Sequence, residues 1–268
     1  MDNYLKYIYL DYLCYHWVDL VSMIQDNYEH ELGSKDSVVV GACARYSLDT
    51  LKESYPAADK YIVYQLEPLY DEHWHPVSKI VSNMQGADEV WDYDLDNIEI
   101  LKSYGIDAKF KPFLYSKKLK RIENKDDLDI DILFYGSLTD DRLKVLSDIF
   151  NWSNSSERLA IIFNFDGEKL DEYISRAKII VDLQTNIEVP NIQKQTRIFY
   201  ALINGKCVVS EKSRRNYYGN LIIEAERDNI VPTIFKVLRE GIWKTHNNKL
   251  SEQFEFYTRG YFTGGKLA

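Results

Sequence analysis

A strand–helix–strand pattern over residues 178–211 constrains the fold more than any other feature of the sequence. The run KIIVDL at 178–183 is β-branched and apolar, which is typical of a buried strand. Asn191 can cap the helix that follows, and Gly205 stands where a helix ends in a left-handed residue. The run CVV at 207–209 then resumes a strand. The spacing predicts a βαβ unit, and such units build parallel sheets covered by helices.

The same alternation fills the rest of the 268 residues. Strands are expected at 4–10, 38–41, 61–66, 89–91, 108–113, 129–135, 159–163 and 221–223. Helices are expected at 13–32, 47–55, 74 or 76–84, 95–104, 142–150, 169–176, 229–239 and 250–257. The fold class is therefore α/β.

The charge-rich run SKKLKRIENKDD at residues 116–127 interrupts the alternation. It is interpreted as a linker between a first domain of residues 1–115 and a second of 128–268, whose C-terminal helix could pack back on the first. The prediction is two doubly wound, Rossmann-like domains facing a central cleft. The alternative is a solvated helix or loop inside one larger domain.

Composition narrows the class of protein. Hydrophobic residues make up 45% and charged residues 28%, which suits a globular core, and a net charge of −9 argues against a generally basic nucleic-acid binder. Cys14, Cys43 and Cys207 form no pattern and are expected to be buried free thiols. The sequence shows neither an apolar leader nor a membrane-spanning run, so a cytoplasmic protein is expected.

Several chemistries are disfavoured because their motifs are missing. The sequence has no phosphate-binding G-x-x-x-x-G-K-[ST], no dinucleotide-binding G-x-G-x-x-G and no hydrolase G-x-S-x-G. It also has no C-x-x-C pair for zinc or redox chemistry.

Four polar side chains are expected where open α/β sheets bind ligands, beyond the carboxyl ends of the strands. Glu188 lies in the loop after the first strand of the βαβ unit, and Glu211 lies just past the second strand. Arg197 lies on the intervening helix, on the same side as Lys194. A helix N-terminus with an arginine can hold a diphosphate.

The run RIFYALINGKCVVSE, residues 197–211, resembles the donor-site segment of the GT-B glycosyltransferases. It departs at Tyr200, where many retaining members carry the second glutamate of an E-x7-E motif that commonly grips the donor ribose. The resemblance implies a nucleoside-diphosphate sugar as donor, UDP- or GDP-linked, with no tightly bound cofactor and no bound metal. The alternative is a plain crossover helix with a surface arginine.

The junction FYGSLT at residues 134–139 resembles the first strand and turn of the donor domain in those enzymes. Gly136 would let a ligand approach the backbone, Ser137 or Thr139 could cap the next helix, and Arg142 lies in its first turn. Asp140 and Asp141 would repel a phosphate unless they point away. The candidate donor-binding residues are Gly136, Ser137, Arg142, Glu188, Lys194, Arg197 and Glu211.

The loop EPLYDEHWHP at residues 67–76 holds the catalytic candidates of the first half. Glu67, Asp71, His73 or His75 could take the proton from an acceptor hydroxyl. Metal binding by the two histidines is a second interpretation, without a third ligand at a recognisable spacing. A plain polar surface loop is the third.

The sequence says less about the acceptor than about any other part of the predicted reaction. A surface glycan is the broad expectation, and a modified base in viral DNA is a sharper one. A DNA acceptor would require basic side chains to line one face of the protein, whereas the alternative is that they are only solvated charges. The sequence has two clusters of such side chains: Lys109, Lys111, Lys117, Lys118, Lys120 and Arg121, and Lys212, Arg214 and Arg215. Two other classes stay open, a non-catalytic nucleotide- or sugar-binding module and a sugar-binding regulator. The oligomeric state is left open.

Overall fold

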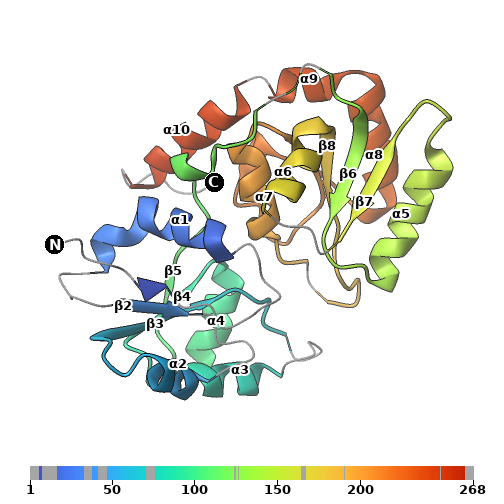
Figure 1. Ribbon diagram of the computed structural model, residues 1–268. Helices are drawn as coiled ribbons and strands as arrows, with labels where there is room; N and C mark the ends of the chain where they lie inside the picture. Colours follow the sequence, from blue (N-terminus) through green and yellow to red (C-terminus); the bar gives the residue numbers. More distant parts are fainter. Residues whose placement is uncertain are drawn as a thin grey trace. The chain divides into compact units, whose positions relative to one another are not determined.

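The computed structural model describes residues 6–7, 17–32, 38–41, 47–70, 76–123, 125, 127–163, 167–189, 191–247 and 249–262. The chain divides into two compact units, Met1–Phe113 and Leu114–Ala268, each built on a parallel five-stranded sheet. Figure 1 shows both sheets with their helices. The predicted α/β class with parallel sheets is therefore confirmed.

The first sheet follows the chain without reversal, in the order β1-β2-β3-β4-β5. Its strands are β1 (Lys6–Tyr7), β2 (Val38–Gly41), β3 (Lys60–Gln65), β4 (Glu89–Asp92) and β5 (Ala108–Phe110). Its helices are α1 (Trp17–Tyr28), η1 (Glu29–Glu31), α2 (Leu48–Ser54), α3 (Val77–Met84) and α4 (Leu95–Ser103). Among the strands described, this order offers no point where neighbouring connections diverge, so the first sheet has no switch point.

Side chains alternate in direction along each strand of the first sheet, so the two faces of the sheet pack against different helices. Val63 and Val90 belong to the aliphatic core under α2, α3 and α4. Tyr64 and Trp91 point the other way, and Trp91 meets Tyr28 of α1 edge to face at 5.8 Å. Figure 1 shows α1 on one side of this sheet and α2 to α4 on the other.

The second sheet has the order β10-β9-β8-β6-β7. Its strands are β6 (Ile130–Tyr135), β7 (Leu159–Ile162), β8 (Ala177–Asp182), β9 (Cys207–Glu211) and β10 (Ile223–Ala225). The chain leaves β6 for β7 on one side and returns to β8 on the other, so the connections diverge between β6 and β8. This is the switch point at which open α/β sheets bind ligands.

Helices cover both faces of the second sheet, as the doubly wound prediction requires. They are α5 (Asp140–Trp152), α6 (Gly167–Arg176), α7 (Gln195–Ile203), α8 (Arg227–Arg239), α9 (Ile242–Asn247) and α10 (Leu250–Phe262), with short turns η2 (Lys117–Leu119) and η3 (Gly219–Leu221). The core under α5 and α8 joins Phe134, Val181 and Val209 to Leu146 and Ile234. Figure 1 shows α6 and α7 on the opposite side.

Three local expectations were wrong. The last strand is β10, while residues 219–221 form a 3₁₀ turn before it. Helix α7 begins at Gln195, and Asn191 does not cap it. Instead Asn191 Nδ2 donates to the carbonyl oxygens of Glu211 at 3.3 Å and Lys212 at 3.1 Å, so the expected cap ties a loop to the end of β9. Helix α9 was not predicted.

The charge-rich segment expected as a linker begins inside the second unit. Its backbone N–H groups at Arg121 and Ile122 donate to Asn204 Oδ1, at 3.2 and 3.0 Å, at the end of α7. Helix α10 packs on α7 within the same unit, and Tyr115 N donates to Thr258 Oγ1 at 2.9 Å.

Cys207 is buried, while Cys14 and Cys43 lie outside the described residues. Within the described ranges, every helix is too short or too polar to span a lipid bilayer.

Candidate functional site

The carboxyl ends of β6 and β8 bring together residues far apart in the sequence. Gly136 follows β6 with φ at +138°, a conformation that L side chains rarely adopt. A Cβ built on Gly136 would lie 2.3 Å from Arg197 Nη2. Glycine is therefore required at this position both by the backbone and by the guanidinium lying against it. The predicted donor-site residues Gly136 and Arg197 are in direct contact.

Arg197 is held from several directions. Its Nη1 is ion-paired with Asp182 Oδ1 at the end of β8, and its guanidinium lies 5.5 Å from the ring of Phe134 and 5.6 Å from that of Tyr135. The Arg197 and Asp182 side chains are only 13% and 4% exposed. Because both groups are buried, the pair fixes the guanidinium at the switch point with little freedom to move.

Asp182 was missed by the sequence analysis. It ends the apolar run KIIVD, and its second oxygen accepts from Ser210 Oγ on β9 at 3.2 Å. A carboxylate that ends a buried parallel strand must lie at the ligand-binding edge of the sheet. That position was the available signal for this residue.

Arg142 holds two loops of the site together through hydrogen bonds. Its Nε and Nη2 donate to the Leu183 carbonyl oxygen at 3.0 and 2.9 Å, and its Nη1 donates to the carbonyl oxygen and Oγ of Ser137 at 2.9 and 2.8 Å. The side chain is buried, so burial and the nearby charge of Arg197 lower its pKa to about 10. Arg142 thereby ties the loop after β6 to the loop after β8.

Glu211 is likewise buried and internally bonded. Its Oε2 accepts from the Gln184 backbone N–H, and its Oε1 accepts from Arg227 Nη1 at 2.9 Å. Burial raises the pKa of Glu211, against the lowering effect of the Gln184 N–H and Arg227. Arg227, also unpredicted, donates from Nη2 to the Asp141 carbonyl oxygen at 2.6 Å, which links α5, β9 and α8 at one edge.

The loop after β8 presents Glu188 to solvent. Gln184 Nε2 donates to the Asn186 and Val189 carbonyl oxygens, both at 2.6 Å, which closes the loop on itself. Asp141 Oδ2 accepts from Ile187 N at 3.0 Å, so this carboxylate is turned to the loop backbone. Glu188 is exposed, and Lys194 occupies the N-cap position of α7.

Charged side chains gather at this edge of the second sheet. The guanidinium groups of Arg142, Arg197 and Arg227 surround the buried carboxylates of Asp182 and Glu211, while Asp141 is paired with Lys144 at 3.2 Å. Asp141 belongs to the same cluster, since the Ile187 N–H, Lys144 and Arg227 all lower the pKa of its carboxyl. The three guanidinium groups provide positive charge that can attract an anionic ligand.

The catalytic candidates of the first unit are described only in part, since Asp71, His73 and His75 lie outside the described residues. The Glu67 carbonyl oxygen accepts from Gln65 Nε2 at 2.9 Å and Asn97 Nδ2 at 3.0 Å. Asn97 Nδ2 also donates to Asp92 Oδ1 at 3.2 Å. The start of this loop is therefore fastened to the ends of β3 and β4.

Asp92 was not predicted. It is fully buried, and burial raises its pKa well above the usual range of a carboxyl. In the described parts of the chain, no three His, Cys, Asp or Glu side chains are grouped to hold a metal ion.

No family model matches the chain, and no curated protein matches it by sequence. Among solved structures it is similar to TarM, with a TM-score of 0.56 and 10% identity over 91% of this chain and 55% of that one. It is also similar to a TarM variant from S. aureus in complex with UDP, alpha-GlcNAc-glycerol and fondaparinux, with a TM-score of 0.53 and 10% identity over 89% and 54%. The chain thus spans about half the length of these neighbours.

These neighbours are GT-B glycosyltransferases. The matches extend over nine tenths of the chain, and both described sheets are parallel and covered by helices. The predicted resemblance is confirmed at the level of the fold: the chain has a GT-B glycosyltransferase-like fold.

Proposed function

We propose that the chain is a glycosyltransferase that moves a sugar from a nucleoside-diphosphate sugar to an acceptor hydroxyl. The observation that carries this proposal is the contact of Arg197 with Gly136 at the switch point of the second sheet. Glycine lets the guanidinium lie against the backbone at this edge, and the guanidinium there supplies charge where a diphosphate would leave. The three guanidinium groups gathered at this edge support the same assignment.

The predicted residues divide into two roles within this proposal. Arg197, Lys194, Ser137 and Glu188 would contact the donor, with Arg197 and Lys194 facing the diphosphate at the start of α7 and Glu188 facing sugar hydroxyls. Arg142 and Glu211 are positioning residues, because both are buried and bonded to neighbouring loops.

A UDP-linked donor is favoured, because a neighbour of the same fold was solved in complex with UDP. A GDP-linked donor remains the alternative. Tyr200 stands where the E-x7-E motif has its second glutamate, so we infer that this chain holds the donor ribose in a different way. Its hydroxyl donates to Asp171 and its ring lies 5.0 Å from the Arg121 guanidinium, so this position is engaged away from the ligand edge.

A glycan acceptor is favoured over a base in DNA, since many of the basic side chains that DNA would require are already neutralised. The ion pairs are Lys109 with Glu89 at 2.9 Å, Lys111 with Glu31, Arg121 with Asp171 at 2.7 Å and Lys212 with Glu226 at 2.6 Å. Glu67, Asp71, His73 and His75 stay the candidates for the base that takes the acceptor proton.

Donor binding is tested by thermal unfolding with UDP, GDP and TDP and their sugars. At a hundredfold excess over its dissociation constant, the correct nucleotide adds about 2.7 kcal/mol to the free energy of unfolding. The double variant Arg197→Gln/Asp182→Asn removes both charges of the buried pair and should lose this shift. Arg239→Gln, which removes a surface arginine paired with Glu157, is the matched control and should keep it.

Transfer is tested separately, by following the consumption of the stabilising nucleotide sugar with oligosaccharide acceptors and with duplex DNA. Product with a glycan supports the proposal, and product with DNA would move the acceptor to nucleic acid. A protein that binds the nucleotide without ever consuming its sugar would be the non-catalytic module. If no nucleotide shifts the melting temperature, the proposal is wrong.

A further inference from the structure

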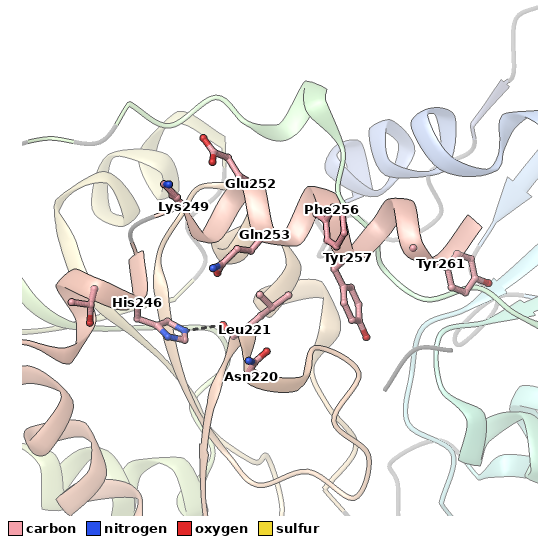
Figure 2. Close-up of a pocket in the computed structure, with 11 residues that line it drawn as sticks. Asn220, Leu221, His246, Lys249, Glu252, Gln253, Phe256, Tyr257 and Tyr261 are labelled. Atoms are coloured by element: carbon pink, nitrogen blue, oxygen red, sulfur yellow. Dashed lines mark hydrogen bonds between the residues drawn. The ribbon is translucent and has the colours of Figure 1, made fainter. Parts of the chain in front are cut away.

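A groove of about 690 Å³ lies between α10, α9 and η3 in the second unit, apart from the candidate donor site. Figure 2 shows its lining side chains. The turn η3 precedes β10, so the groove adjoins the amino end of that strand. The register pairs Ala225, at the carboxyl end of β10, with Glu211. The groove and the donor edge therefore lie toward opposite ends of this strand.

The groove combines aromatic rings with planar polar side chains. Gln253, Tyr257 and Tyr261 recur every four residues and so share one side of α10, and Figure 2 shows the first two directed toward Asn220 and Leu221. Phe256 lies at the rim and is 79% exposed. Aromatic faces pack against the C–H faces of pyranose rings, while amides both donate to and accept from hydroxyls.

The lining charges argue against an anionic ligand. Lys249 and Glu252 carry opposite charges, and His246 Nε2 is already engaged in a hydrogen bond of 2.9 Å to the Leu221 carbonyl oxygen. The groove thus has no excess of positive charge with which to attract phosphate or nucleic acid. Its volume falls in the range of about 300–1,000 Å³ that holds ligands of a few rings.

From this lining we infer that the groove binds a neutral oligosaccharide, with Phe256, Tyr257 and Tyr261 as the aromatic platform and Asn220 and Gln253 as hydrogen-bonding partners. The further assignment of this oligosaccharide as a distal part of the acceptor rests on the proposed function. The binding itself does not depend on that function, so the two can fail separately.

The test uses the full chain and a panel of chitotetraose, maltotetraose, cellotetraose and mannotetraose, measured by saturation-transfer NMR and calorimetric titration. We expect at least one to bind. Phe256→Ala should weaken it about tenfold and Gln253→Ala about fivefold. The matched control is Phe150→Ala, which removes a phenylalanine that is 69% exposed on α5 and should leave affinity unchanged.

The nucleotide-dependent melting shift of each variant separates the two proposals. Binding of an oligosaccharide that Phe256→Ala weakens, with the nucleotide shift intact, supports the groove. Equal affinity in wild type and Phe256→Ala, or no binding across the panel, overturns it even if the nucleotide shift is present. Self-association that Phe256→Ala abolishes would assign this face to a second copy of the chain and would also overturn it.

Discussion

The buried pair of Arg197 and Asp182 makes a quantitative prediction for stability. Replacing Arg197 by glutamine leaves the Asp182 carboxylate, 4% exposed, without its cation and with the Ser210 hydroxyl as a hydrogen-bond donor. Breaking a buried ion pair from one side costs about 3–5 kcal/mol, because an uncompensated charge stays buried. We therefore expect Arg197→Gln to lower the free energy of unfolding by about 4 kcal/mol.

The reverse change should cost less. In Asp182→Asn the guanidinium keeps its contacts with the rings of Phe134 and Tyr135, which are worth up to about 2 kcal/mol in a desolvated setting. A loss of about 2–3 kcal/mol is expected. The double variant removes both charges and leaves two amides able to bond each other, so it should lose only about 2 kcal/mol.

Urea unfolding of the wild type and the three variants forms a double-mutant cycle. The losses of the two single variants sum to about 6–7 kcal/mol and the double variant loses about 2, so the coupling energy between residues 197 and 182 should be about 4–5 kcal/mol. The cycle of Arg239→Gln and Glu157→Gln, a surface pair, is the control and should couple by less than about 1 kcal/mol. If the losses at 197 and 182 simply add, the two charges do not compensate each other and this account of the site fails.

Two further perturbations test the site and its surroundings. Gly136→Ala should lower the free energy of unfolding by about 1–3 kcal/mol and abolish the nucleotide-dependent melting shift, because the new Cβ meets Arg197 Nη2 and φ stays at +138°. Urea unfolding measures the first effect and thermal scans with the nucleotide measure the second. An unchanged melting shift would contradict the close approach of Arg197 to Gly136. Burial lowers the pKa of Lys206 from 10.5 to about 8, so the unfolded chain binds the extra proton between these values and stability should rise with pH across that window, by up to about 3 kcal/mol relative to Lys206→Met. Parallel stability–pH curves for the two proteins would refute it.

The architecture could be predicted because strand and helix have different apolar periods. The runs expected as strands at 129–135, 178–183 and 207–209 became the adjacent strands β6, β8 and β9, and α7 ended before Gly205 as expected. The strand order could not be predicted in the same way, since every parallel order is compatible with the same alternation. The switch point between β6 and β8 therefore had to come from the structure.

Some residues of the site were predicted from the sequence and others were not, and the contacts of the site show why. Position after a strand singled out Gly136, and position on the crossover helix singled out Arg197, but neither position shows which partner a long side chain bonds. Arg142, a donor-site candidate from the sequence, instead bonds Leu183 and Ser137. Asp182 was taken as part of a strand, although its carboxylate is the partner of Arg197. Such pairings join residues far apart in the chain and leave no local pattern.

The charges at the ligand edge suggest why so polar a cluster is kept buried. Burial and, after it, the charge of Arg197 lower the pKa of Arg142, so the two guanidinium groups lie close enough to repel each other. Asp182 and Glu211 offset part of this repulsion and hold the side chains in place, so no reorientation is needed when an anion arrives. In the proposed function, the guanidinium groups attract the diphosphate, and its affinity should therefore fall as salt is added. A purely structural ion-pair cluster would bind no diphosphate, and no salt-dependent affinity would then be measured.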